Sequence, residues 1–322
     1  MLISEDILKK ILIVPAKEGA DSLLILTGYA SPSMATWLIT ALYEENIPAV
    51  SIRLIIGMAT YDGLNETIHE EFKELHGKNF GDGYSSFTCS YSYGQPVHAN
   101  LYIWIKKGTP YKAYISSACF MQKAFLSNRM ELAEKCVPTE AQIIFDKAES
   151  NSIFCNHSEV GEYIQFTKYS TLTDIDEKNG SVLKGAGIEH VKLSLLSKSG
   201  NTGSKSGLNW GQRSRRNKNQ AYIPLPKEIA LSGFFPLNKQ QFSAHTDDGH
   251  ILVLRVEQQG DKAITTPLCN ADIGEYFRNR LGLKNGAYVD IVDLLNYGRT
   301  DVDFYKIDDE EFYMDFSIAG TD

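Results

Sequence analysis

Residues 97–119, VHANLYIWIKKGTPYKAYISSAC, decide how the first half of the chain folds. Two runs rich in aromatic and β-branched residues flank a turn that carries glycine and proline, a pattern that predicts a β-hairpin. Side chains two residues apart on a strand point to the same side of the sheet. We therefore expect His98, Asn100 and Tyr102 on one strand face. Alone, His98 is either an ordinary strand histidine with a satisfied hydrogen bond or the nucleophile of a phosphodiesterase.

The returning strand of this hairpin ends in polar residues. Ser117 and Cys119 follow its apolar run, and Glu131 opens a further strand-like segment, MELAEKCV. Adjacent strands of a sheet lie about 4.8 Å apart, so residues near their ends can meet. Ser117 and Cys119 are therefore expected at the end of the strand adjacent to that of His98 and Asn100.

The segments before the hairpin alternate between strand and helix patterns. Apolar runs at 23–28 and 49–58 predict buried strands, whereas 31–45 and 64–78 have helical spacing of apolar residues. Strand–helix–strand–helix order is typical of βαβ units, which require a parallel or mixed sheet. The N-terminal half is therefore predicted to be an α/β domain with helices flanking a mixed sheet.

The second half has a different pattern, mainly of short strands. The segments read as strands are 190–197, 220–226, 250–260, 287–295 (AYVDIVDLL) and 302–308, and those read as short helices are 226–235 and 270–282. This predicts a mainly-β open barrel with two short helices. A polar, glycine-containing stretch separates the halves, so we predict domains at 1–172 and 188–322 joined by a linker at 173–187.

Composition excludes several classes of protein. No apolar run approaches the roughly 20 residues needed to cross a bilayer, and the first residues lack the pattern of a secretory signal. The five cysteines are widely spaced without a CxxC pair, which favours reduced thiols over disulfides or a zinc site. We expect a soluble cytoplasmic protein without membrane contacts or a bound metal.

Charge is distributed unevenly. The net charge is −8, yet residues 190–227 contain eight Lys or Arg and no Asp or Glu. Such a local basic segment is either a solvated loop or an arm that binds phosphates, because the local field matters more than the sum.

The hairpin resembles the active-site region of the phospholipase D superfamily, whose signature is HxK followed by GSxN. The stretches TGYASPSMATWL and VHANLYIWIKKGTPYKAYISSACFMQKAF are similar to its restriction-enzyme branch, the BfiI-type and NgoFVII-type endonucleases. The resemblance aligns His98 with the histidine nucleophile and Ser117 with the motif serine, and makes Glu131 the acid. Asn100 stands at the lysine, Ser116 at the glycine and Cys119 at the asparagine.

These departures affect the part of the site that holds phosphate. An amide at position 100 can donate hydrogen bonds but brings no positive charge to the pentavalent anion. The family uses two histidines, and a chain with one motif builds its site across a two-fold axis. The resemblance therefore implies a homodimer through the N-terminal domain.

Residues 188–307 resemble the plant B-three DNA-binding fold, and NWGQR…NQAYIPLP is similar to the NgoFVII-type enzymes in particular. The hallmark is a helix followed by the turn RLGLKNG (280–286). Such domains grip the DNA major groove with two arms. The N-terminal arm would contain Trp210, Gln212, Arg213, Arg215, Arg216, Asn217, Asn219 and Gln220, and the C-terminal arm Asp261, Lys262, Thr265, Thr266 and Asn270.

The function implied is sequence-specific, metal-independent DNA cleavage by a restriction enzyme subunit. The sequence has no nucleotide-binding loop, so any ATP hydrolysis would come from a separate helicase-like ATPase subunit, as in NgoFVII-type systems. The alternative is a catalytically impaired dimer that only binds DNA. A phospholipase is disfavoured, because the chain lacks membrane-binding features.

Overall fold

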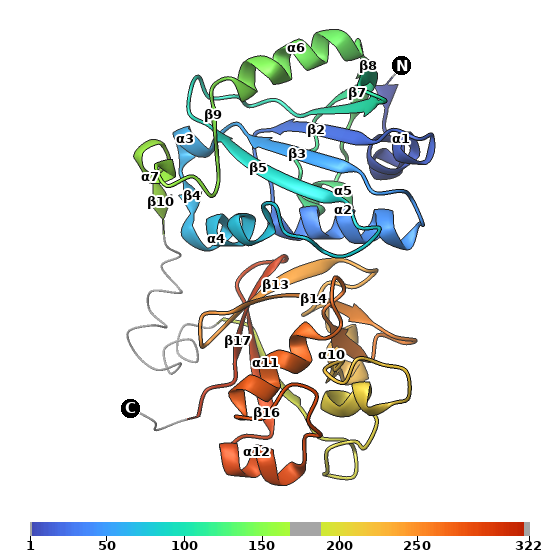
Figure 1. Cartoon of the computed structure of the whole chain (residues 1–322), viewed down its shortest axis with the longest axis vertical. Helices are drawn as coiled ribbons and strands as arrows, with labels where there is room; N and C mark the ends of the chain where they lie inside the picture. The colour runs from blue at the N-terminus through green and yellow to red at the C-terminus, as the bar shows by residue number, and fades with distance from the viewer. Residues whose placement is uncertain (1, 168–187, 319–322) are drawn as a thin grey trace. The chain divides into compact units, whose positions relative to one another are not determined.

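The computed structural model describes residues 2–167 and 188–318, and the chain divides into two compact units, Met1–Tyr169 and Ser170–Asp322 (Figure 1). The linker predicted at 173–187 lies outside the described residues. Each unit has its own hydrophobic core.

The N-terminal unit contains an eight-stranded sheet in the order β1-β8-β7-β6-β2-β3-β5-β9. The strands are β1 (Leu2–Ile3), β2 (Ser22–Thr27), β3 (Ser51–Ile56), β5 (Ser86–Ser92), β6 (Leu101–Lys106), β7 (Thr109–Ser116), β8 (Ala133–Cys136) and β9 (Ser152–Phe154). β2, β3 and β5 are parallel neighbours, and β2 pairs antiparallel with β6. The predicted mixed sheet is confirmed.

Helices cover both faces of this sheet (Figure 1). α6 (Pro138–Glu149) lies on one face, and α2 (Pro32–Glu44) and α4 (Glu66–Leu75) lie on the other. The shorter elements are a π-helix (Lys9–Ile13), α1 (Val14–Lys17), α3 (Ala59–Asp62), α5 (Gln122–Phe125), α7 (Val160–Tyr163) and the β4–β10 pair (Leu64–Asn65 and Phe166–Thr167). Both predicted helices, at 31–45 and 64–78, are therefore present as α2 and α4.

The C-terminal unit is a seven-stranded sheet in the order β11-β16-β17-β13-β14-β15-β12. The strands are β11 (His190–Ser194), β12 (Ile223–Pro224), β13 (Gln241–Thr246), β14 (Ile251–Glu257), β15 (Ala263–Thr265), β16 (Asp301–Lys306) and β17 (Glu311–Asp315). The two end strands, β11 and β12, lie close together, so the sheet is a nearly closed barrel. Buried aromatic rings, among them Phe235, Phe242 and Phe312, fill its core. The predicted open barrel is confirmed.

One segment of this unit was predicted wrongly. AYVDIVDLL was expected to be a strand, but residues Ile291–Tyr297 form helix α12. The Asp290 carboxylate accepts a hydrogen bond from the Val292 amide, and Asp293 accepts one from the Asp290 amide, which makes a capping box. This local cap outweighs the alternation of β-branched residues. Among the described residues of this unit, α12 therefore joins α10 (Lys227–Leu231), α11 (Asp272–Arg280) and the 3-10 helix Gly207–Gln212.

Candidate active site and DNA-binding surface

Two glycines bring the histidine segment against the carboxyl ends of the parallel strands. The Val97 amide donates to the Gly57 carbonyl at 3.0 Å, and a Cβ on Gly57 would lie 2.2 Å from the Val97 oxygen. A Cβ on Gly28 would lie 2.7 Å from Cδ2 of His98. Only glycine leaves room for this approach at either position.

His98 lies in the segment before β6, which begins at Leu101. The predicted shared strand face of His98, Asn100 and Tyr102 is therefore wrong. The physical reason is that Val97 pairs with the loop after β3 instead of with a neighbouring strand. His98 is exposed, whereas Asn100 and Tyr102 are buried.

Tyr29 supports the imidazole of His98. The two ring centroids are 5.6 Å apart in an edge-to-face arrangement. The Tyr29 hydroxyl donates to the Asp62 carboxylate at 2.6 Å, and this hydrogen bond to a carboxylate raises the pKa of Tyr29 to about 12. The phenol therefore stays protonated at neutral pH and holds its ring beside His98.

The amide of Asn100 joins three parts of the site. Its Oδ1 accepts from the Thr27 hydroxyl at 2.7 Å, and its Nδ2 donates to the carbonyls of Ser116 and Ser117, each at 3.2 Å. Both amide hydrogens are thus used within the protein, and the side chain is 8% exposed. Asn100 is a structural link between β2 and the end of β7, and it has no free donor for a phosphate in this conformation.

Ser117 and Glu131 lie together, as the resemblance implied. The Ser117 hydroxyl donates to the Glu131 carboxylate and also accepts from the Leu132 amide at 2.9 Å. Ser117 is exposed and Glu131 is half-buried. Cys119, two residues further, is half-buried between Ala118 and Phe120, whose side chains are fully buried.

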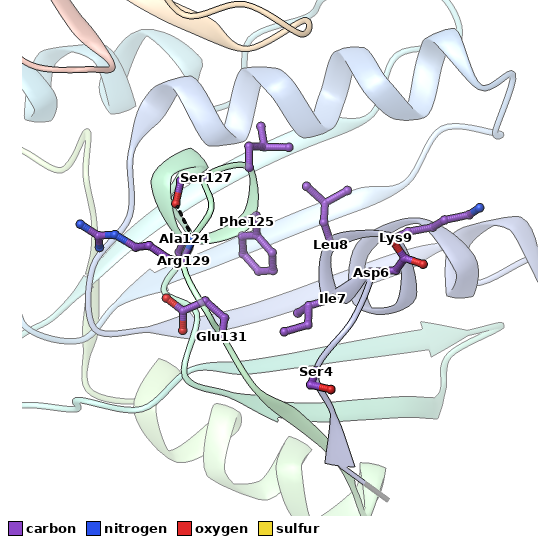
Figure 2. Close-up of a pocket in the computed structure, with 11 residues that line it drawn as sticks. Ser4, Asp6, Ile7, Leu8, Lys9, Ala124, Phe125, Ser127, Arg129 and Glu131 are labelled. Atoms are coloured by element: carbon purple, nitrogen blue, oxygen red, sulfur yellow. Dashed lines mark hydrogen bonds between the residues drawn. The ribbon is translucent and has the colours of Figure 1, made fainter.

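A pocket of about 330 Å³ adjoins the serine–glutamate pair, because Glu131 lines it. Its other lining residues are Ser4, Asp6, Ile7, Leu8, Lys9, Ala124, Phe125, Leu126, Ser127 and Arg129 (Figure 2). Arg129 and Glu131 lie on one side of the pocket and Asp6 and Lys9 on the other (Figure 2). The sequence reading missed Tyr29 and Arg129. Their positions in the chain were the available signal, because Tyr29 directly follows Gly28 and Arg129 stands two residues before Glu131.

The predicted N-terminal DNA-binding arm begins in a 3-10 helix (Gly207–Gln212) that contains Trp210 and continues as a loop. The Arg216 guanidinium lies 4.1 Å from the Trp210 ring centroid and donates to the side chain of Gln220 at 3.0 Å. The side chains of Arg213, Arg215, Arg216 and Asn217 are exposed. The arm therefore presents three exposed arginines, of which Arg216 stacks on the Trp210 ring and Arg213 donates to the Lys205 carbonyl at 2.9 Å.

Asn219 and Gln212 of this arm bind residues outside it. Asn219 donates to the Glu275 carboxylate at 2.7 Å and accepts from the Gly286 amide at 2.5 Å. The Gln212 side chain donates to the Gly286 carbonyl at 3.0 Å. These bonds attach the arm to the 280–286 turn, and they occupy the amide groups that would read a base edge.

The predicted C-terminal arm presents fewer exposed groups. The Thr265 hydroxyl donates to Glu257 at 2.9 Å and that of Thr266 to the Cys269 carbonyl at 2.6 Å, and both residues are 2% exposed. Lys262 is exposed, while Asp261 and Asn270 are half-buried. Lys262 is thus the most accessible polar side chain among these five.

The described ranges contain neither a candidate membrane span nor a candidate metal site. None of their helices is both long and apolar enough to span a bilayer. They also contain no group of three His, Cys, Asp or Glu side chains arranged to hold a metal ion.

The fold and the site define a two-part protein, a phospholipase D-like nuclease domain followed by a B3-like DNA-binding domain. The model of the NgoFVII restriction endonuclease N-terminal PLD domain matches residues 5–162. That of the NgoFVII C-terminal B3-like DNA-binding domain matches residues 183–308. The chain belongs to the NgoFVII restriction endonuclease family, as its sequence patterns predicted.

Solved structures give more distant similarities. NucT from Helicobacter pylori is 14% identical with a TM-score of 0.33, and the match covers 48% of this chain and 97% of that one. A polyphosphate kinase from Porphyromonas gingivalis is also 14% identical, with a TM-score of 0.30, and 57% of this chain matches 28% of the kinase. A search of curated proteins finds no significant match.

Proposed function

We propose that this chain is the nuclease subunit of a restriction system and cleaves DNA through a covalent intermediate on His98. The observation that supports this most is the local assembly around Asn100. That residue ties the segment after His98 to the end of β7, beside the Ser117–Glu131 pair. The proposed domains are 1–172, a linker at 173–187, and 188–322.

In the proposed reaction, an imidazole nitrogen of His98 attacks the phosphorus. A P–N bond forms as a P–O bond to the leaving sugar breaks, and the leaving oxygen takes a proton from the partner's His98. Water then attacks the phosphorus and gives a proton to the partner's His98, a P–O bond forms, and the P–N bond to His98 breaks to release the phosphate end. Ser117 and Glu131 orient the phosphate, and Cys119 lies beside them.

The second histidine requires a homodimer through the N-terminal domain, with the site on a two-fold axis. This chemistry uses no metal, since the imidazole itself is the nucleophile. The double-stranded DNA target would reach the enzyme in the cytoplasm, and a helicase-like ATPase would act as a separate subunit if the system uses ATP.

Base recognition is proposed to come from the exposed part of the two arms. Arg213, Arg215 and Arg216 are suited to guanine edges or phosphates, and Lys262 is the candidate on the second arm. Asn219, Thr265 and Thr266 are proposed to hold the arms in shape, because their polar groups are occupied within the protein.

A second function has support from one observation. Asn100 replaces the family's lysine and spends its amide hydrogens on two backbone carbonyls. Without another cation, the site would lack charge stabilisation of the pentavalent phosphorus. The protein would then be a dimeric, sequence-specific DNA-binding protein with little or no cleavage.

The test is cleavage of a plasmid pool of diverse sequence in EDTA, with and without a partner ATPase. Wild type is compared with His98→Ala and with His157→Ala, an exposed histidine of the same unit. We expect His98→Ala alone to abolish cleavage. Cleavage that survives in His98→Ala or vanishes with chelator contradicts the mechanism, and specific binding without cleavage in wild type favours the second function.

A further inference from the structure

The phosphate site needs a positive charge that the motif does not supply. Asn100 is neutral, and its donors are committed to Ser116 and Ser117. Lys106 donates to the Glu18 carbonyl and Lys112 pairs with the Glu18 carboxylate, while Lys107 lies in the turn at the far end of the β6–β7 hairpin. A cation for a phosphorane dianion must therefore come from another element.

Arg129 has the position and the freedom for this role. It lies two residues before Glu131, whose carboxylate accepts from the Ser117 hydroxyl, and both residues line the same side of the pocket (Figure 2). The side chain is exposed, and its guanidinium has no carboxylate partner among the residues the structure describes. The backbone at this point is held by the bond from the Arg129 amide to Ser127 Oγ at 3.2 Å.

The other cation of the pocket is less suitable. Lys9 lies on the opposite side, near the acidic Asp6, and belongs to the π-helix. A guanidinium also presents several donors in a planar fork and can bind two phosphate oxygens at once, whereas an ammonium acts as a point charge.

We infer that Arg129 supplies the phosphate-binding cation of this active site, in place of the lysine that Asn100 replaces. The inference rests on the proposed function, because it takes the site at His98 as the place where the diester binds. Arg129 binds the non-bridging oxygens of the phosphate and stabilises the extra negative charge that develops as His98 attacks. It transfers no proton, and Asn100 keeps its structural role.

The test uses the full chain and two probes that bypass DNA recognition. Hydrolysis of bis(p-nitrophenyl) phosphate reports the chemistry, and calorimetric titration with inorganic phosphate reports the anion site. The variants are Arg129→Ala, Arg129→Lys and, as the control on the opposite side of the pocket, Lys9→Ala. Thermal unfolding of each variant identifies any that misfolds.

We expect Arg129→Ala to lower kcat/KM about 10²-fold. It should weaken phosphate binding about tenfold, as expected for a lost charge-assisted hydrogen bond. Arg129→Lys should recover part of both losses, because it restores the charge but not the planar fork. Lys9→Ala should stay within about twofold of wild type, because that side chain lies across the pocket. Rescue by lysine would not occur if Arg129 only maintained the loop.

The outcomes separate this inference from the proposed function. If wild type binds phosphate in an Arg129-dependent way but hydrolyses no diester, the cation site stands and the proposed catalysis fails. If Arg129→Ala matches Lys9→Ala with both probes, or wild type binds no phosphate, the inference is overturned.

Discussion

At the scale of a single residue, the proposed function places Asn100 at a motif position and gives it a structural role. In the family signature this position carries a lysine that contacts phosphate. Here its amide connects Thr27 at the end of β2 with Ser116 and Ser117 at the end of β7. A buried amide with its donors and main acceptor satisfied stabilises the architecture of the site. Under our proposal, Arg129 and not residue 100 supplies the positive charge for the phosphate.

Asn100→Ala should therefore destabilise the protein. Removing the amide leaves the Thr27 hydroxyl and two carbonyls without these partners, at a cost of about 1–3 kcal/mol in the free energy of unfolding. Urea denaturation measures this change, with Asn156→Ala, at an exposed asparagine of the same unit, as the control. Equal stability of the two variants would show that the Asn100 bonds contribute little.

Substitutions in the N-terminal DNA-binding arm should separate into those that affect DNA binding and those that affect stability. Arg213→Ala or Arg215→Ala should cost about 1–3 kcal/mol of cognate binding and relax specificity, because these exposed side chains are candidates for base contacts. Asn219→Ala should mainly lower stability, since its amide bonds Glu275 and Gly286. The measurement is binding to cognate and random duplexes beside thermal unfolding.

Phosphate contacts should behave differently again. Lys205→Ala or Lys218→Ala should weaken binding to all sequences alike and flatten the salt dependence, because each removes one neutralised phosphate. A loss confined to the cognate duplex would contradict this assignment and make the lysine a base-reading residue.

At the scale of elements, α12 illustrates a local signal that competes with strand periodicity. Its Asp290 cap, its capping box and the left-handed Gly298 at its end define a helix of only seven residues. Such a short helix depends on its termini, because isolated short helices are marginal in water.

Asp290→Ala should therefore lower the free energy of unfolding by about 1 kcal/mol, the usual value of an N-cap. Lys284→Ala, at an exposed position of the preceding turn, is the control. The comparison is made by urea denaturation of the full chain, following the transition of the C-terminal unit. A cap variant as stable as the control would mean that packing of Leu294 alone maintains α12.

At the scale of the whole molecule, DNA cleavage and sequence recognition should be separable by mutation. His98→Ala should lose cleavage and keep cognate binding within about twofold, because its imidazole contacts the diester only in the reaction. Arg213→Ala should lose cognate preference and keep hydrolysis of bis(p-nitrophenyl) phosphate, which presents no base. If His98→Ala alters sequence preference, the assignment of the two units to these tasks is wrong.

The sequence by itself determined the two-unit organisation and the class of each unit. Apolar periodicity located β2, β3, α2 and α4, because burial of one face imposes a period on a single segment of chain. The residues at 98, 117 and 131 were assigned from the resemblance to the family, and Ser117 meets Glu131 because one follows β7 and the other precedes β8, two paired strands.

Tertiary structure alone decided which hydrogen-bond donors and acceptors of the polar side chains in the site remain available for a ligand. No pattern in the sequence shows that the Asn100 amide donates to a backbone carbonyl or that the Asn219 amide donates to the carboxylate of Glu275. The same holds for Arg129, which lacks a carboxylate partner within the described ranges. Hydrogen-bond satisfaction depends on the distance between segments distant in sequence, and only the folded arrangement of strands and loops sets that distance.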